Sequence, residues 1–251
     1  MLSVGRKAVA SRGLEVRVLA GDLNHCFDFP CTDVCHTGNV RPNLPARRDH
    51  IRVIMIAAAP PADPAEPLAD YNDPVIRAET LAAFRAAGFE VATVADIRNL
   101  GVYVTSAVKC PKIGFGLKPE TIGNCSKLLE AELAMFPNVK SILLMGNTAI
   151  KAINEIATRQ LGEPVIPTGS AYKVKCHEYR FGEISLFPSY PASGRNLSVE
   201  GDRTEVIAVD IRNAIEVAGG PPTRPHRTAP QREQHRSPGP QRYEALQGSG
   251  E

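Results

Sequence analysis

The chain has 251 residues, of which 43% are hydrophobic and 22% are charged. These are ordinary values for a globular protein, and the length allows one large domain or two small ones. The longest apolar run, 53–59, ends at Pro60-Pro61 and is too short to cross a bilayer. Arg6 and Lys7 are not followed by an apolar segment, so no signal peptide is predicted. We therefore expect a cytoplasmic protein without membrane contact.

The formal net charge is +2, and it is unevenly distributed along the chain. Residues 219–251 carry five arginines and three glutamates, so the rest of the chain balances 24 basic against 24 acidic residues. A strongly basic nucleic-acid-binding surface is thereby excluded, and any such binding needs a local patch. The same C-terminal window is a third Pro and Gly, a composition typical of disorder. We predict an N-terminal extension (1–21), a domain (22–218) and a disordered tail (219–251).

Strand and helix patterns alternate along the predicted domain. The strands are predicted at 52–57, 90–94, 102–108 and 141–145, with a hairpin over 174–187 that turns near Phe181-Gly182. The helices are predicted at 74–88, 119–136, 147–160 and 203–217. Strands separated by helices indicate a mostly parallel sheet covered on both faces, in three α/β/α layers. In such a fold the ligand site lies at the carboxyl ends of the strands. This topology places four segments at the carboxyl ends: 57–61, 105–106, 146–148 and 187–190.

Three of the six cysteines are clustered, and Cys176 stands apart from the others. Cys26, Cys31 and Cys35 lie close together near the N-terminus, Cys110 follows a predicted strand, and Cys125 lies on the next helix. A disulfide framework is not expected in a chain without export signals. Three cysteines within ten positions favour an iron–sulfur cluster or a zinc ion, and the spacing fits both. Buried structural thiols are the other interpretation.

Several motifs resemble the uracil-DNA glycosylase superfamily, in its iron–sulfur (family 4-like) branch. The matching segments are Val108-Lys-Cys-Pro111, 121–126 around Cys125, Leu143–Ala149, Thr168–Tyr172 and Phe187-Pro-Ser-Tyr190, in the family's order. The resemblance covers roughly residues 22–217 and implies a central, mostly parallel four-stranded sheet between helices. It also implies a [4Fe–4S] cluster held by Cys31, Cys35, Cys110 and Cys125, with Cys26 as an alternative N-terminal ligand and zinc as the alternative metal.

Three positions depart from the family's motifs. The acidic residue of its first motif falls at Ala58, an Asn that reads the uracil edge falls at Ser106, and a His falls at Phe187. Neither Ala58 nor Phe187 can activate water or stabilise a departing uracil anion. Asp63, on the loop after the Pro pair, is the preferred substitute acid. The resemblance implies that substrate contacts come from seven positions: Ala59, Pro60, Tyr71, Ser106, Asn147, Phe187 and Ser189.

The resemblance implies removal of uracil, or a related deaminated base, from DNA by base flipping. The partner is then DNA containing such a base, and we expect a monomer. Two alternatives are carried beside this hypothesis. One is a catalytically impaired, cluster-stabilised protein that binds DNA or a modified base. The other is a zinc-bound structural protein that shares the fold alone.

Overall fold

The computed structural model describes residues 30–38, 44–60, 74–114, 116–169, 171–175, 177–191 and 201–220. The predicted N-terminal extension, most of the predicted tail, Cys26, Asp63 and Tyr71 lie outside these residues. No helix in the described part of the chain combines the length and the apolar character needed to cross a membrane.

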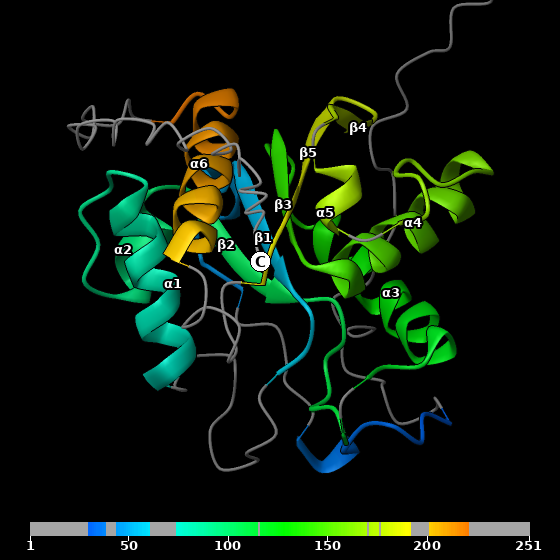
Figure 1. Cartoon of the computed structure of the whole chain (residues 1–251). Helices are drawn as coiled ribbons and strands as arrows, with labels where there is room; N and C mark the ends of the chain where they lie inside the picture. The colour runs from blue at the N-terminus through cyan, green and yellow to red at the C-terminus, as the bar shows by residue number, and fades with distance from the viewer. Residues whose placement is uncertain are drawn as a thin grey trace, which may run out of the picture.

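A five-stranded sheet in the order β2-β1-β3-β5-β4 forms the centre of the fold (Figure 1). The strands are β1 (Val53–Ala57), β2 (Val102–Ser106), β3 (Ser141–Met145), β4 (Tyr179–Phe181) and β5 (Ile184–Ser189). The pairs β2–β1, β1–β3 and β3–β5 are parallel, and β4 pairs antiparallel with β5 at the edge. The predicted mostly parallel sheet is confirmed, although it has five strands where the resemblance implied four. The additional strand is the short arm of the predicted hairpin.

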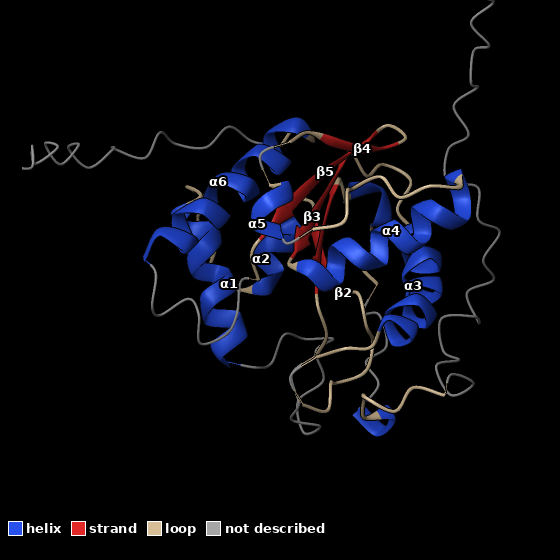
Figure 2. Ribbon diagram, turned by 45° about the vertical axis from the view of Figure 1, so that its right-hand side comes forward, coloured by secondary structure: helices blue, strands red, loops and turns tan. Residues whose placement is uncertain are grey.

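Helices cover both faces of the sheet, which gives three layers (Figure 2). The helices are α1 (Pro74–Ala86), α2 (Val94–Asn99), α3 (Pro119–Leu133), α4 (Asn147–Leu161), α5 (Ala171–Val174) and α6 (Gly201–Val217). Two 3-10 turns, His36–Gly38 and Arg48–His50, precede the sheet. Figure 1 shows α1, α2 and α6 on one side of the sheet and α3, α4 and α5 on the other.

The central strands β1 and β3 are apolar at nearly every position because both faces of the sheet are buried there. Along β1, Ile54 and Ile56 belong to the core under α3 and α4, whereas Val53 and Met55 belong to the core under α1 and α6. Side chains on a strand alternate between its faces, so a strand buried on both sides carries apolar residues at consecutive positions. This is why the continuous runs at β1 and β3 were identifiable from the sequence.

Three predicted elements differ from the structure. The predicted strand 90–94 is a turn leading into α2, because Thr93 and Asp96 form a reciprocal capping box at the helix start. The predicted strand 102–108 ends at Ser106. The N–H groups of Ala107 and Val108 then donate to the carbonyls of Ala57 and Ala58, at the end of β1 and just after it. The predicted hairpin over 174–187 begins only at Tyr179, after the short helix α5, and turns at Gly182 with a positive φ of 58°.

Candidate active site

The carboxyl ends of four strands bring the predicted site segments to one edge of the sheet. Ala57 at the end of β1 lies beside Ser106 of β2, and Met145 of β3 lies beside Ser189 of β5. Backbone hydrogen bonds extend this order into the loops. Val108 N–H donates to the Ala58 carbonyl at 3.0 Å, and Gly146 N–H donates to the Ser189 carbonyl at 2.9 Å. The loops after all four parallel strands therefore meet, as the topology predicted.

The side chains at this edge differ in their access to solvent. Ala58 and Ala59 are half-buried, Pro60 and Ser106 are buried, and Asn147 is exposed. The side chain at position 58 is a methyl group, so the described part of this loop, residues 58–60, supplies no carboxylate. Phe187 packs into the core under α1 and α6 and pairs in register with Leu143, two residues before the end of β5. Its ring therefore serves packing in this structure.

The N-terminus of α4 opens onto the same edge. Its N-cap is Gly146, with φ 91° and no side-chain cap, and Asn147 is the first helical residue. The first N–H groups of a helix lack partners within the helix, and together with the helix dipole they favour a negative charge. A side chain at 146 would be strained at that φ, and its Cβ would lie 3.0 Å from Cγ of Pro191. Glycine thus lets the 191 segment approach the helix start.

A buried carboxylate, Asp210 of α6, fastens the end of β5. The Ser189 hydroxyl donates to Asp210 Oδ2 at 2.5 Å, and the Lys175 ammonium forms an ion pair with the same oxygen. Burial raises the pKa of Asp210 above its ordinary value, although the hydrogen bonds and the charge of Lys175 act in the opposite direction. Ser189 is completely buried. Its hydroxyl is thus directed at Asp210 inside the protein.

A pocket of about 440 Å³ lies beside this group, between β5 and α6. Its lining includes Lys175, Asp210, Phe187 and Pro188. The pocket continues from Asp210 along α6 toward Val217. Since Ala218 at the end of α6 contacts Arg52, which precedes β1, the pocket extends away from the carboxyl edge.

A second buried ion pair lies under the end of β2. Lys109 Nζ is 2.5 Å from Glu132 Oε2 of α3, and both side chains are at most 5% exposed. Tyr103 and Thr105 each donate a hydroxyl to Glu132 Oε1 at 2.7 Å. The Lys109 ammonium also donates to the Ser106 carbonyl at 2.6 Å. Lys109 is therefore held in place inside the protein, next to the carboxyl end of β2.

The N-terminal cysteine segment, 30–38, is attached to the chain around Cys110 and to the start of α3. Val34 and Lys112 form an antiparallel bridge, and Cys35 N–H donates to the Pro111 carbonyl at 2.8 Å. Asp33 accepts from Lys118 N–H at 2.6 Å and from the Thr121 hydroxyl at 2.5 Å. Asp33 therefore caps α3 from a distant part of the chain, since the N-cap residue Lys118 has no side-chain cap of its own.

Burial acts to raise the pKa of Asp33, but the hydrogen bonds from Lys118 and Thr121 prevail and hold it below the usual carboxyl range. Hydrogen bonds to the charged form therefore dominate at this carboxylate. The segment is attached most strongly when Asp33 is ionised.

These attachments place the segment that carries Cys31 and Cys35 against the chain after Cys110 and against the start of α3, the helix that carries Cys125. None of the four is in a disulfide, and Cys110 and Cys125 are buried whereas Cys31 and Cys35 are half-buried. Cys31 packs against the core that contains Cys110 and Cys125. Within the described residues, no three His, Cys, Asp or Glu side chains are grouped to hold a metal ion. The donor chemistry fits a soft metal or cluster, whereas the side chains are not drawn together around one.

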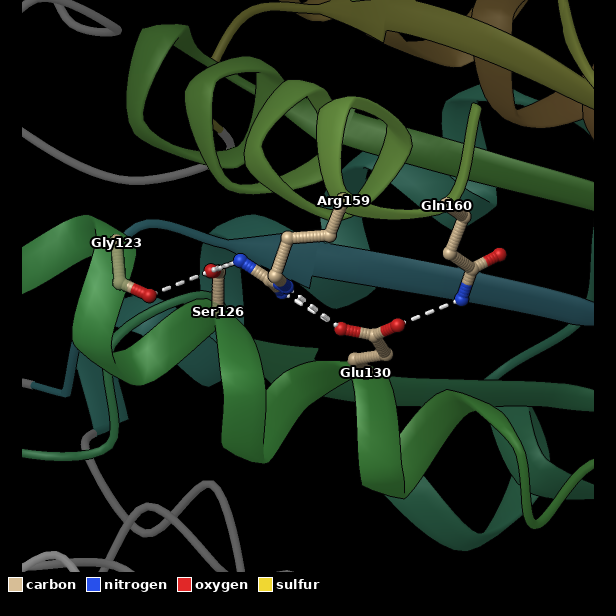
Figure 3. Close-up of polar contacts among 5 residues, drawn as sticks. All are labelled: Gly123, Ser126, Glu130, Arg159 and Gln160. Carbon is tan, nitrogen blue, oxygen red and sulfur yellow. Dashed lines mark hydrogen bonds and ion pairs between the residues drawn. The ribbon is translucent and has the colours of Figure 1, made fainter. Parts of the chain in front are cut away.

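A polar network between α3 and α4 supports the part of α3 that carries Cys125 (Figure 3). Arg159 donates to Glu130 Oε2 at 2.7 and 3.0 Å and to the Ser126 hydroxyl at 2.8 Å. Ser126 in turn donates to the Gly123 carbonyl at 2.7 Å, and Gln160 donates to Glu130 Oε1 at 2.6 Å. Ser126 directly follows Cys125, so the network fixes this turn of the helix from α4.

The fold and the edge site define an α/β/α protein whose binding groups lie at the carboxyl ends of parallel strands. The model of the family described as "Uracil DNA glycosylase superfamily" matches residues 48–209, more than half of the chain. The chain belongs to this superfamily. It is 34% identical over 125 residues to a type-5 uracil-DNA glycosylase from Thermus thermophilus. That alignment covers 49% of this chain and 54% of the relative, so the chain spans about half of the relative's length.

Sequence reasoning did not find Asp210, Lys175 or Glu132. Asp210 and Glu132 lie within helices whose neighbouring residues are apolar, and an acid at a core-facing helical position is the signal that was available. Lys175 lay inside a stretch that the sequence assigned to a hairpin. Lys109, in the motif Val108-Lys-Cys-Pro111, is also buried, and the sequence pattern did not indicate its partner.

Proposed function

We propose that the protein hydrolyses the N-glycosidic bond of uracil, or of a related deaminated base, in DNA. The observation that carries this proposal is the family match, because residues 48–209 include all four segments of the carboxyl-edge site. The similarity to a type-5 uracil-DNA glycosylase supports the same substrate class. That the protein acts as a monomer in the cytoplasm stays a prediction from the sequence.

In the proposed reaction the bond between the sugar C1′ and the base nitrogen breaks, and its electron pair leaves with the base. The base therefore departs as an anion, and the sugar develops positive charge at C1′. The start of α4, at Asn147, directs the positive end of the helix dipole at that anion. The Ser106 carbonyl is held by Lys109, which fixes the conformation of the chain where the base edge is to be read.

Water then adds its oxygen to C1′ and loses a proton. The group that takes this proton has to be a base near the carboxyl edge of the sheet. We propose Asp63, because Ala58 supplies no carboxylate and Asp63 lies three residues after Pro60 in the sequence. Tyr71 is proposed to stack on the flipped base, since an aromatic ring accepts the face of any base. Both side chains lie outside the described residues.

The test is strand scission. The purified protein is incubated with a labelled oligonucleotide that contains one uracil, and alkali then cleaves any abasic site. We expect cleavage at the uracil by the wild type, a loss of at least about 100-fold in rate for Asp63→Asn, as for removal of a general base, and a smaller loss for Asn147→Ala. Asp49→Asn is the matched control, because Asp49 is exposed in the 3-10 turn before β1. Binding without cleavage overturns the glycosylase proposal and leaves a recognition protein.

We also propose that Cys31, Cys35, Cys110 and Cys125 bind a [4Fe–4S] cluster, with Cys26 the alternative N-terminal ligand. Four cysteines on segments that hydrogen-bond to one another are a donor set suited to such a cluster. The cluster would supply structural cross-linking between the N-terminal segment and α3. The N-terminal pair lies before the region matched by the family model.

Anaerobic purification with iron, sulfide and zinc analysis tests this assignment. We expect a brown protein, near-complete loss of iron in Cys110→Ser, and unchanged iron in the matched control Cys176→Ser. Cys26→Ser and Cys31→Ser, compared with each other, identify the N-terminal ligands. A colourless protein that contains zinc overturns the cluster and leaves the alternative metal.

A further inference from the structure

His36, in the 3-10 turn at the end of the cysteine segment, lies between that segment and the chain after β2. Its Nε2 lies 3.0 Å from the carbonyl oxygen of Cys31, and its Nδ1 lies 3.9 Å from Sγ of Cys110. Cys110 is completely buried, and His36 is half-buried. One imidazole ring therefore contacts both parts of the chain that carry the predicted metal ligands.

The contact with the carbonyl determines where the proton lies on this ring. A carbonyl oxygen only accepts hydrogen bonds, so Nε2 carries the hydrogen and donates it to Cys31. In the neutral ring Nδ1 is then the nitrogen that carries the lone pair, and it faces the Cys110 sulfur. Histidines that bind metals commonly donate their second ring nitrogen to a backbone carbonyl in this way. His36 therefore has the tautomer and the orientation of a metal ligand.

The spacing of the two donor atoms fits a single metal ion. Zinc binds histidine nitrogen at about 2.0–2.1 Å and cysteine sulfur at about 2.3 Å in a tetrahedral arrangement, which places two such donors about 3.6 Å apart. The observed 3.9 Å is slightly longer. In a [4Fe–4S] cluster each protein ligand binds a different iron atom, so the ligands lie farther from one another than on one ion. His36 and Cys110 are therefore spaced for one ion.

Two further thiols can complete such a site. Cys31 packs against the core that contains Cys110 and Cys125. The amide nitrogen of Asn124, the residue before Cys125, lies 4.0 Å from the Cys31 sulfur. Because no three donors are grouped around one point within the described residues, zinc has to draw Cys31 and Cys125 toward His36 and Cys110.

Cys35, the other thiol of the described cysteine segment, has a different contact. Its sulfur lies 3.1 Å from the Thr37 hydroxyl, and this contact is exposed. The next residue, His36, is instead directed at the buried Cys110. The segment thus offers a thiol and an imidazole at consecutive positions, and only the imidazole approaches Cys110 at the spacing of a second ligand on the same ion.

We propose that the protein binds one zinc ion when it carries no iron–sulfur cluster, and that Nδ1 of His36 and Sγ of Cys110 are two of its ligands. Cys31 and Cys125 complete a Cys₃His set, which is a composition of closed structural zinc sites. The inference goes beyond the proposed cluster, in which Cys35 takes the place that His36 has here. Each thiol that binds zinc gives its proton to the solvent. Zinc bound in this way links the cysteine segment to the chain after β2 and to α3.

The test is a zinc titration of the full chain. The protein is purified anaerobically, freed of metal with a chelator under reducing conditions, and titrated with zinc in competition with a chromophoric chelator. We expect one zinc per chain and an affinity at least about 100-fold lower in His36→Ala, because even the loss of a group that supports a metal ligand costs about 10–100-fold. We expect the wild-type affinity in Cys35→Ser and in the matched control His177→Ala, which removes an exposed histidine before β4.

X-ray absorption at the zinc edge identifies the donor atoms without a substitution. We expect three sulfur atoms at about 2.3 Å and one nitrogen atom at about 2.0–2.1 Å. A shell of four sulfur atoms overturns the role of His36 and assigns the fourth place to Cys35 or Cys26. Should His36→Ala fail to fold, this measurement on the wild type still decides between the two ligand sets.

The outcomes distinguish the zinc site from the proposed activity and the proposed cluster. A wild type that binds no zinc, or an unchanged affinity in His36→Ala, overturns the site and leaves the contact between His36 and Cys110 as a hydrogen bond. A large loss in Cys35→Ser beside a normal His36→Ala overturns it as well. Iron in the protein as isolated and excision of uracil are measured separately, so either of those proposals can fail while the zinc site stands.

Discussion

Replacing Glu132 with Leu is expected to destabilise the protein by about 5 kcal/mol, the upper end of the range for breaking a buried ion pair. The change leaves the Lys109 ammonium, 5% exposed, without its counter-charge. It also removes the acceptor of the Tyr103 and Thr105 hydroxyls, and each buried hydroxyl without a partner costs about 1–3 kcal/mol. These contributions overlap, so they do not add in full.

Lys109→Met is expected to cost less, about 3 kcal/mol. The Glu132 carboxylate then loses the ammonium but keeps both hydroxyl donors on Oε1. The double variant Lys109→Met/Glu132→Leu contains no buried charge, and only the two hydroxyls lose their acceptor. We expect it to lose about 2 kcal/mol, less than either single variant, because the two changes are strongly coupled.

Urea unfolding followed by circular dichroism measures these differences. With a slope of about 3 kcal/mol per molar urea, a loss of about 5 kcal/mol lowers the midpoint by about 1.7 M. Should Glu132→Leu unfold in buffer, Lys109→Met and the double variant still give the order. The reasoning is refuted if the double variant is less stable than Lys109→Met, or if Lys109→Met lies within about 1 kcal/mol of the wild type.

Three further perturbations follow from the structure. Asp33→Asn is expected to destabilise at neutral pH. Because the pKa of Asp33 is lowered in the folded state, that stability is complete above the unfolded pKa of about 3.9 and disappears as the pH falls through the folded value. Gly146→Ala is expected to lose about 1–3 kcal/mol, because its φ of 91° is unfavourable for alanine and its Cβ meets Pro191. Arg159→Met is expected to lose only about 1 kcal/mol, because the Glu130 ion pair is partly exposed and Ser126 keeps its bond to a carbonyl.

Urea midpoints check all three predictions, and a different result would contradict each one. For Asp33→Asn, a difference from the wild type that stays constant between pH 7 and pH 3 rules out the linkage. For Gly146→Ala, the control is Gly162→Ala, which shares a positive φ but has no neighbour within 4 Å of the added Cβ. Equal losses in the two glycine variants show that Pro191 plays no part. A loss above about 3 kcal/mol in Arg159→Met contradicts the small effect of an exposed pair.

The buried strands and long helices could be predicted because burial dictates their composition. Strands β1 and β3 are apolar at nearly every position, and α3 and α4 show a helical period. The segment 90–94 was wrongly predicted as a strand because Val91, Thr93 and Val94 are β-branched, whereas the capping box of Thr93 and Asp96 starts a helix there. Local hydrogen bonds of this kind outweigh β-propensity in a short segment.

The position of the site segments at the carboxyl edge could be predicted from the sequence, whereas the partners of the buried charges could not. Parallel strands place their carboxyl ends together, so the segments at Ala58, Ser106, Asn147 and Ser189 could be located from order alone. The partners of buried charges come from helices far along the chain, such as Glu132 for Lys109. Periodicity says that a residue faces inward, but it does not say which opposite charge it meets.

The cap that Asp33 gives to α3 also fixes an order of events during synthesis of the chain. The bond from Lys118 to Asp33 spans 85 residues, and the bond from Thr121 spans 88. A ribosome makes the N-terminal thiols long before the helix that receives them, and this contact closes a long loop. Until residue 121 has emerged, Cys31 and Cys35 have no docking site on α3. Their chemistry with oxidants or metals in that interval is therefore that of an unprotected peptide.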